Sequence, residues 1–187
     1  ALLGPLPPVM VSCGNMQTAN IITVAWTGIV NTHPPKTYIS LRPSRHSYPI
    51  IRETGEFVIN LSTASLIRAV DYCGVRSGKD VDKFAVTGLT PQESFQVSCP
   101  SIAQCPLTLE CRVTDIVPLG SHDMFLADIV CVGVDEQYVD AAGRLCMDQC
   151  GLAAFAHGEY FQVAKKIGSF GFSVRKPKKK RRKHSPA

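Results

Sequence analysis

The sequence lacks the common signatures of nucleotide-binding and hydrolytic enzymes. It has no Walker phosphate loop, no G-x-G-x-x-G opening a helix, no H-E-x-x-H pair and no G-x-S-x-G elbow. Its eight cysteines form no C-x-x-C pair, and no apolar run reaches the length of about 18 residues that crosses a membrane. These absences argue against a P-loop enzyme, a zincin protease, an α/β-hydrolase and a membrane-spanning helix.

Charge is also missing from the first 35 residues, which contain no Asp, Glu, Lys or Arg. Prolines and side-chain amides interrupt this stretch, and no basic residue stands before Leu2 and Leu3, so we do not expect a secretion signal. Without such a signal, the eight cysteines indicate reduced thiols that pack as small core residues in a cytoplasmic protein. The spacing of Cys146 and Cys150 suits adjacent helical turns or chance, and we expect no metal site.

The length of 187 residues and the 45% apolar content fit one compact domain. Residues 175–187 hold 8 of the 20 basic residues, so residues 1–174 carry 12 basic against 15 acidic side chains, a charge of −3. We predict a folded domain over residues 1–174 and a basic, disordered tail over residues 175–187. The tail suits a phosphate-seeking arm, a targeting signal or a solubilising end, and nucleic acid is expected to bind only there.

Six short runs rich in β-branched and apolar residues predict strands in the first two thirds of the chain. They cover residues 9–13, 21–26, 37–41, 56–61, 107–117 and 124–134. Clusters of Gly, Pro, Asn and Ser separate them, and residues 14–15 and 118–121 are expected to form hairpin turns. The pattern predicts a closed antiparallel sheet with a buried N-terminal hairpin.

Two helices are expected between these strands. Apolar residues at helical spacing predict one helix over residues 63–72, with Ser62 as its N-cap. A second helix is expected after Ser77, because Ser77 and Asp80 have the spacing of a capping box. Residues 151–168 predict a third segment, helical or irregular, since three glycines weaken a long helix there.

Residues 40–47 combine two guanidinium groups, an imidazole and three hydroxyls directly after a predicted strand. A phosphate monoester carries up to about two negative charges and three acceptor oxygens, which arginine forks and serine hydroxyls match. The candidate ligands are Ser40, Arg42, Arg45 and Ser47. The alternative is a solvated loop whose arginines pair with surface carboxylates.

Three further positions have both a binding and a structural interpretation. Trp26, the only tryptophan, ends a strand with small side chains and suits stacking on a flat ring, a subunit interface or core packing. Free N–H groups near Ser77, Gly78 and Lys79 suit a carbonyl or an electron-rich ring edge, or simple helix capping. His122 follows a tight turn, where it could donate a hydrogen bond or a proton or serve the structure alone.

Taken in order, these segments resemble the flavin reductase-like, flavoredoxin-type proteins of the FMN-binding split-barrel fold. The resemblance covers roughly residues 7–135. It rests on Pro7-Pro8-Val9, Thr23-Val24-Ala25-Trp26, Ser40-Leu41-Arg42, residues 53–60, residues 77–84, Gly88-Leu89-Thr90-Pro91 and Gly120-Ser121-His122.

The resemblance implies a mainly β protein with a few helices, a six-stranded antiparallel barrel with Greek-key features and a homodimer with one FMN per subunit near the interface. It implies that the isoalloxazine ring lies along the backbone of Thr23, Val24, Ala25, Trp26 and Thr27. The phosphate would be held by Ser40, Arg42 and Ser47, with Leu41, Arg45 and His46 beside them. The pocket would be completed by Cys73, Gly74, Ser77, Gly78, Lys79 and His122.

The implied function is an FMN-dependent oxidoreductase. NADH or NADPH would deliver a hydride to N5 of the flavin, and reduced flavin or another acceptor would be the product. The cofactor carries the chemistry, so no general acid or base is required, and His122 is the one candidate. One alternative is a flavoredoxin-type electron carrier with a redox partner and no nicotinamide site; another is binding of an anionic partner through the tail.

Overall fold

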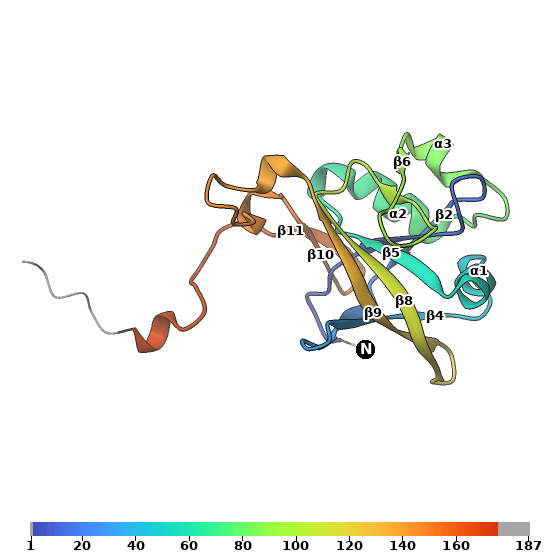
Figure 1. The fold of residues 1–187 in the computed structure, drawn as a ribbon, viewed down its shortest axis with the longest axis horizontal. Helices are drawn as coiled ribbons and strands as arrows, with labels where there is room; N and C mark the ends of the chain where they lie inside the picture. Colours follow the sequence, from blue (N-terminus) through green and yellow to red (C-terminus); the bar gives the residue numbers. More distant parts are fainter. Residues whose placement is uncertain (1, 176–187) are drawn as a thin grey trace, which may run out of the picture.

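The computed structural model of the chain describes residues 2–175, and strands dominate it (Figure 1). Seven strands form one antiparallel sheet in the order β2-β1-β5-β8-β9-β4-β3. The mainly β class is confirmed, although the sheet contains seven strands rather than six. The strands are β1 (Val9–Cys13), β2 (Asn20–Val24), β3 (Thr27–Asn31), β4 (Lys36–Leu41), β5 (Glu56–Asn60), β8 (Leu107–Pro118) and β9 (Asp123–Val134).

The two edge strands of this sheet are neighbours in the sequence. Only Ala25 and Trp26 separate the end of β2 from the start of β3, and the two strands do not pair. At this bend the N–H of Thr27 donates to the carbonyl of Ala25 at 3.0 Å, and the N–H of Ser40 donates to the carbonyl of Trp26 at 2.9 Å. The sheet therefore curls into a half-barrel with an open seam, and the expected single strand over residues 21–26 ends two residues early.

The strand pattern buries apolar side chains on both faces of the central strands. All five residues of β1 are buried, as predicted for the N-terminal hairpin, and Gly14 turns this hairpin with a φ of 87°. Inside the half-barrel, the rings of Tyr48 and Phe125 meet edge to face at 5.2 Å. A second apolar cluster, which includes Met10 and Phe84, lies between the sheet and two helices.

The first helix of the structure was not predicted from the sequence. It is α1 (Ser47–Thr54), which follows the arginine-rich loop and ends at Gly55 in the left-handed region. The helix expected over residues 63–72 begins as a 3-10 turn, η1 (Ala64–Leu66), and continues as α2 (Ile67–Val75). Ser62 does not cap it, because the buried Ser62 hydroxyl has no hydrogen-bond partner in the described part of the chain.

The capping box predicted at Ser77 and Asp80 is wrong. The next helix, α3 (Lys83–Thr87), starts later, and its cap is Asp82, whose carboxylate accepts from the N–H of Ala85 at 3.1 Å. Ser77 instead accepts from the N–H of Lys79 at 3.2 Å within a turn. A local side-chain-to-backbone hydrogen bond has therefore replaced the longer-range cap.

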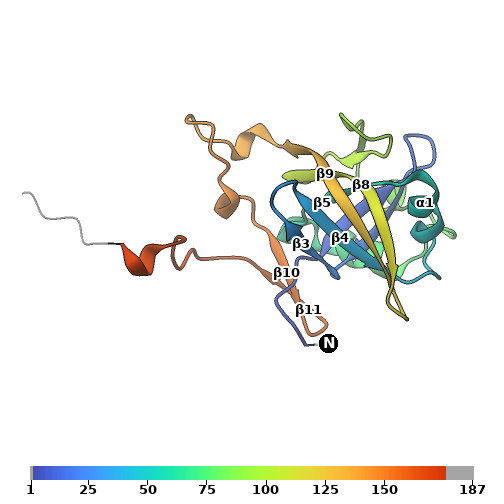
Figure 2. The same ribbon diagram turned by 60° about the horizontal axis from the view of Figure 1, so that its bottom comes forward.

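The segment expected to be helical or irregular near the C-terminus is a hairpin of β10 (Ala153–Ala156) and β11 (Glu159–Gln162). Figure 2 shows this hairpin beside the N-terminal segment, where Leu6 and Phe155 exchange backbone hydrogen bonds of 2.8 Å. The remaining short elements are β6 (Pro91–Gln92), β7 (Ser101–Ile102), η2 (Glu136–Tyr138), η3 (Met147–Gln149) and η4 (Phe172–Val174).

All eight cysteines are free thiols, and seven of them are buried, as expected for small core residues. Residues 2–175 contain no helix long and apolar enough to span a membrane. The same range holds no group of three or more His, Cys, Asp or Glu residues that could bind a metal ion. The predicted tail lies outside the described residues, apart from Arg175.

Candidate functional site

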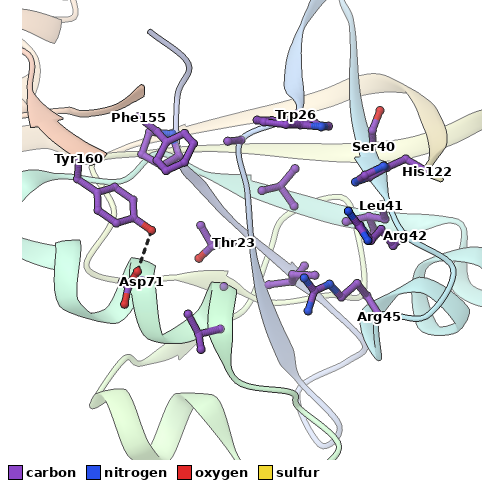
Figure 3. Close-up of a pocket in the computed structure, with 16 residues that line it drawn as sticks. Thr23, Trp26, Ser40, Leu41, Arg42, Arg45, Asp71, His122, Phe155 and Tyr160 are labelled. Carbon is purple, nitrogen blue, oxygen red and sulfur yellow. Dashed lines mark hydrogen bonds between the residues drawn. The ribbon is translucent and has the colours of Figure 1, made fainter. Parts of the chain in front are cut away.

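A cavity of about 330 Å³, here named the seam cavity, opens where the chain bends from β2 to β3 (Figure 3). Its volume falls within the range of small-molecule sites. In Figure 3, Trp26, Ser40, Arg42 and His122 lie across the cavity from Asp71, Phe155 and Tyr160. The lining comprises Pro8, Ile22, Thr23, Val24, Ala25, Trp26, Ser40, Leu41, Arg42, Arg45, Asp71, Gly74, Val75, His122, Phe155 and Tyr160.

A smaller hollow of about 120 Å³, here named the polar pocket, adjoins the seam cavity. The two share Ile22, Arg45 and Gly74, so a ligand could extend from one into the other. Hydroxyl, amide, guanidinium and ammonium groups dominate its wall. Its lining comprises Asn20, Ile22, Ser44, Arg45, His46, Ser47, Cys73, Gly74, Arg76, Ser77, Gly78 and Lys83.

Lys83 is the most unusual residue of the polar pocket, because its side chain is almost completely buried, with 4% of the residue exposed. Its ammonium group donates to the carbonyls of Ile21 at 2.7 Å and Cys73 at 2.8 Å. No ion pair within residues 2–175 involves Lys83. Burial lowers its pKa, and the nearby charge of Arg45 adds to this effect. A buried ammonium without a carboxylate partner favours an anion at the pocket.

Close backbone packing shapes the floor of the polar pocket. The side-chain amide of Asn20 donates to the Ser47 hydroxyl at 2.8 Å, and both residues are buried. A Cβ atom at Gly78 would lie 2.0 Å from the amide oxygen of Asn20, so only glycine fits there. The hydroxyl of Ser47 is the acceptor in this hydrogen bond, and Ser47 lines the polar pocket beside Asn20.

The far end of the seam cavity has an aromatic and acidic wall. The hydroxyl of Tyr160 donates to the carboxylate of Asp71 at 3.1 Å, which ties β11 to α2. Burial, together with this hydrogen bond and the charge of Asp71, raises the pKa of Tyr160 to about 12. The ring of Phe155 packs against that of Tyr160 at 5.4 Å. The wall is therefore held by contacts between two elements far apart in the sequence.

The near end of the seam cavity carries two permanent cations and a neutral imidazole. Burial lowers the pKa of His122, and the charges of Arg42 and Arg45 lower it further. The Nδ1 atom of His122 lies 2.9 Å from the Ser121 hydroxyl. Because the ordinary histidine pKa is already below 7, this shift keeps His122 uncharged at neutral pH.

The structure brings most of the predicted site residues to these two hollows. The seam cavity is lined by the predicted Thr23, Val24, Ala25, Trp26, Ser40, Leu41, Arg42, Arg45, Gly74 and His122. The polar pocket is lined by Arg45, His46, Ser47, Cys73, Gly74, Ser77 and Gly78. The expected phosphate ligands are thus divided, since Ser40 and Arg42 lie in the first hollow and Ser47 in the second.

Two predicted residues line neither hollow. The hydroxyl of Thr27 donates to the carbonyl of Tyr38 at 2.6 Å, so this side chain is buried in the sheet. Lys79 is exposed and lies in a separate surface depression with Asp80 and Asp82. Lys79 and Lys83 occupy one segment of the sequence, but only Lys83 reaches the polar pocket.

Sequence reasoning missed several lining residues, chiefly Asn20, Asp71, Arg76, Lys83, Phe155 and Tyr160. Lys83 lies shortly after Ser77 and Asp80, whose spacing resembles a helix start. Nothing in this local sequence distinguishes Lys83 from a solvated lysine. Phe155 and Tyr160 lie in a segment whose pairing was not predicted. The one available signal was the family resemblance over residues 77–84, which contains Lys83.

Comparison with known proteins identifies the family of the chain. Residues 4–164 match the family model described as a flavin reductase like domain. The chain belongs to the flavin reductase-like family. An uncharacterized protein of Archaeoglobus fulgidus is 32% identical to it over 138 residues, which cover 74% of this chain and 77% of the relative. The resemblance inferred from the sequence is therefore confirmed. The family match supports a flavin-related redox function for this domain.

Solved structures give the same result for the fold. The flavoredoxin of Desulfovibrio vulgaris (Miyazaki F) superposes on this flavin reductase-like domain with a TM-score of 0.87 and 29% identity, over 94% of this chain and 96% of the flavoredoxin. The flavoredoxin of Methanosarcina acetivorans has a TM-score of 0.82 and 25% identity, over 91% and 93% of the two chains. An FMN-binding protein of Thermus thermophilus, at 21% identity and a TM-score of 0.76 over 89% and 90%, shares the fold.

Proposed function

We propose that this flavin reductase-like domain binds FMN and acts as an NAD(P)H-dependent oxidoreductase that reduces flavin or another acceptor. The observation that carries the proposal is the buried, unpaired ammonium of Lys83 in a pocket that adjoins the seam cavity. Bound FMN would supply the redox chemistry, accepting a hydride from reduced nicotinamide and passing electrons to the acceptor. FMN has a ring, a ribityl chain and a phosphate, which together match a cavity that narrows into a cationic pocket.

The phosphate belongs in the polar pocket on this proposal. Lys83 supplies a buried ammonium, Arg45 a planar guanidinium and Ser47 a hydroxyl group. Charge-assisted hydrogen bonds of this kind are roughly twice as strong as neutral ones, and phosphate is the FMN group that can accept several of them. The donor set therefore fits FMN better than riboflavin, which lacks the phosphate.

The ring belongs in the seam cavity, beside the free edge of β2. Because β2 is an edge strand that does not pair with β3, its outer backbone edge has no strand partner, whereas the carbonyls of Ala25 and Trp26 at the bend already accept from Thr27 and Ser40. The hydroxyl of Thr23 is already committed to the carbonyl of Val70, so the backbone of Thr23 to Trp26 is what this wall offers to a flat ring. Fixed backbone dipoles suit the polar rim of isoalloxazine.

The same proposal includes a homodimer in the cytoplasm. Ile29 and Val30 are exposed on the edge strand β3, and Trp26 is partly exposed at the adjoining cavity. An apolar strip of this kind beside a cavity supports contact with a second subunit. The free, buried cysteines support a reducing compartment.

The decisive test is flavin binding by the purified 187-residue chain. We expect FMN added in excess to remain bound through gel filtration and to show the visible bands of oxidised flavin, with riboflavin retained far less. The two ligands share the ring and differ in the phosphate, so their difference reports on the polar pocket. A chain that retains neither compound at millimolar excess would contradict the proposal.

A second measurement distinguishes the oxidoreductase from a flavoredoxin-type electron carrier. The carrier is the alternative because the chain is 29% identical to a flavoredoxin. NADH or NADPH is added to the FMN-loaded protein without oxygen. Bleaching of the bound flavin within the time of turnover supports the nicotinamide-dependent enzyme. If bleaching occurs only with a reduced redox protein, the carrier is correct.

A further inference from the structure

The chain after β11 leaves the body of the molecule as an arm of residues 163–175 (Figures 1 and 2). Its large apolar residues are exposed, with fractions of 96% for Ile167, 104% for Phe170, 62% for Phe172 and 84% for Val174. Single exposed apolar residues are common on protein surfaces, but four within eight positions form a patch. A patch of this kind marks a surface that binds another surface.

The arm has local structure of its own. Gly171 adopts a φ of 75°, and the N–H of Phe172 donates to the carbonyl of Ser169 at 2.9 Å. The ring of Phe172 lies so close to the Gly168 backbone that a Cβ at Gly168 would approach it to 2.9 Å. This turn presents Phe170 outward, so part of the ordering cost of binding is met before a partner arrives.

Charge is divided sharply between the body and the C-terminal end. Residues 163–187 hold 10 of the 20 Lys and Arg residues and none of the 15 Asp and Glu residues. Residues 1–162 therefore carry 10 basic against 15 acidic side chains, a formal charge of −5 against +10. The arm itself holds three of these basic residues, Lys165, Lys166 and Arg175, and no acidic one, so the body of a second copy complements it in charge, and opposite potentials favour such an encounter.

A shallow groove of about 600 Å³ lies beside the root of the arm. Its apolar floor comes from Ala64 of η1, from Ile67 at the start of α2 and from Tyr160 and Phe161 of β11, and Glu159 also lines it. Tyr160 also lines the seam cavity, so one side chain forms part of both walls. Anything that fills the groove therefore packs against the wall of the proposed flavin site.

We propose that the arm of one copy docks in this groove of a second copy, and that the exchange is reciprocal. This inference rests on the homodimer of the proposed function and names the segment that assembles it. A two-fold arrangement covers both arms and both grooves with the same set of contacts. The arm would then brace the Tyr160 wall of the partner from outside, which links assembly to the proposed flavin site.

The test measures the monomer–dimer dissociation constant of the 187-residue chain by sedimentation velocity. The double variant Ile167→Ser/Phe170→Ser removes the exposed apolar side chains of the arm and is expected to raise this constant about tenfold or more. The groove variant Phe161→Ser is expected to raise it similarly. Combining both changes should add little further, because each removes the same contact.

The matched control is Phe95→Ser, which removes an exposed aromatic side chain outside the arm and the groove. It is expected to leave the constant within about twofold. An unchanged constant in the arm variant, additive effects of arm and groove, or a monomeric wild-type chain would each overturn the proposal. FMN content measured on the same samples reports separately on the flavin site, so failure of one proposal is distinguishable from failure of the other.

Discussion

The seam cavity and the polar pocket adjoin each other but are built in opposite ways. Consecutive residues of one strand and its bend, from Ile22 to Trp26, supply a continuous wall of the seam cavity. The polar pocket instead combines residues from four separate elements, β2, α1, α2 and α3, among them Asn20, Ser47 and Lys83. A flat ring can be bound by backbone that any strand edge provides, whereas a concentrated charge needs particular side chains brought together by the fold.

The largest expected effect is the loss of the buried ammonium. Lys83→Met keeps the length of the side chain and removes its charge, and we expect the dissociation constant for FMN to rise about 100-fold, the scale for removing a charged hydrogen-bonding partner. Quenching of flavin fluorescence measures it. Riboflavin affinity should change far less, since the ring site is untouched.

Lys79→Met is the control for this variant, because Lys79 is exposed and lines neither hollow. Its affinity for FMN should stay within about threefold of the wild type. If both variants lost FMN affinity equally, the effect would come from the net charge of the protein. Binding of the phosphate in the polar pocket would then be contradicted.

Arg42 and Arg45 also distinguish the polar pocket from the seam cavity. Arg45 lines both hollows, whereas Arg42 lines only the seam cavity. We expect Arg45→Ala to weaken FMN binding by about 2 kcal/mol and Arg42→Ala by about 1 kcal/mol, because only Arg45 reaches the polar pocket. Calorimetric titration with FMN measures both; a larger loss at Arg42 would move the phosphate into the seam cavity.

The affinity for FMN should also depend on pH through Lys83. Burial lowers the pKa of Lys83 below its ordinary value of 10.5, so the ammonium loses its proton earlier than a solvated lysine. The charged form binds phosphate, and affinity is therefore present below the lowered pKa and is lost as the pH rises through it. Titrations from neutral to alkaline pH should show this loss for FMN at a lower pH than the ordinary lysine pKa of 10.5.

Two controls accompany the pH series. Riboflavin has no phosphate and should show no such alkaline loss, and Lys83→Met should remove the loss for FMN. An identical alkaline fall for both ligands would place its origin in the protein fold rather than in the polar pocket.

The smallest expected effect concerns the aromatic wall. Tyr160→Phe removes the hydrogen bond to Asp71, and we expect the free energy of unfolding to fall by about 0.5–1 kcal/mol, since the pair is partly exposed. Urea unfolding measures this change. FMN affinity should stay within about threefold, because the phosphate contacts remain; a loss as large as that of Lys83→Met would reverse the expected ranking.

Most of the sheet could be predicted from the sequence because strand formation leaves a local record. Alternating and continuous apolar runs, separated by turn residues, located β1, β4, β5, β8 and β9 to within a residue or two. The sheet order and the missed strand β3 could not be obtained in this way. Thr27 to Asn31 is short, largely exposed and separated from β2 by a bend that no apolar pattern marks.

The candidate site likewise contains residues that the sequence indicated and residues that it did not. Residues 40–47 stood out by composition, and the structure places all but Pro43 along one hollow or the other. The Ser77–Asp80 capping box failed because Asp82 offered a better local cap. Lys83 was missed for a related reason: as the first residue of a short helix, it resembles any solvated lysine until the fold buries it.

The sequence by itself determined most strands of the main sheet, the hairpin turn at Gly14 and the arginine-rich loop, because these depend on residues close together in the chain. Only the tertiary structure decided that β2 and β3 would leave a seam and that Lys83 would be buried between Ile21 and Cys73. The physical reason is that the burial of Lys83 and its lack of a carboxylate partner depend on neighbours that come from distant segments of the chain. No local pattern of residues encodes them.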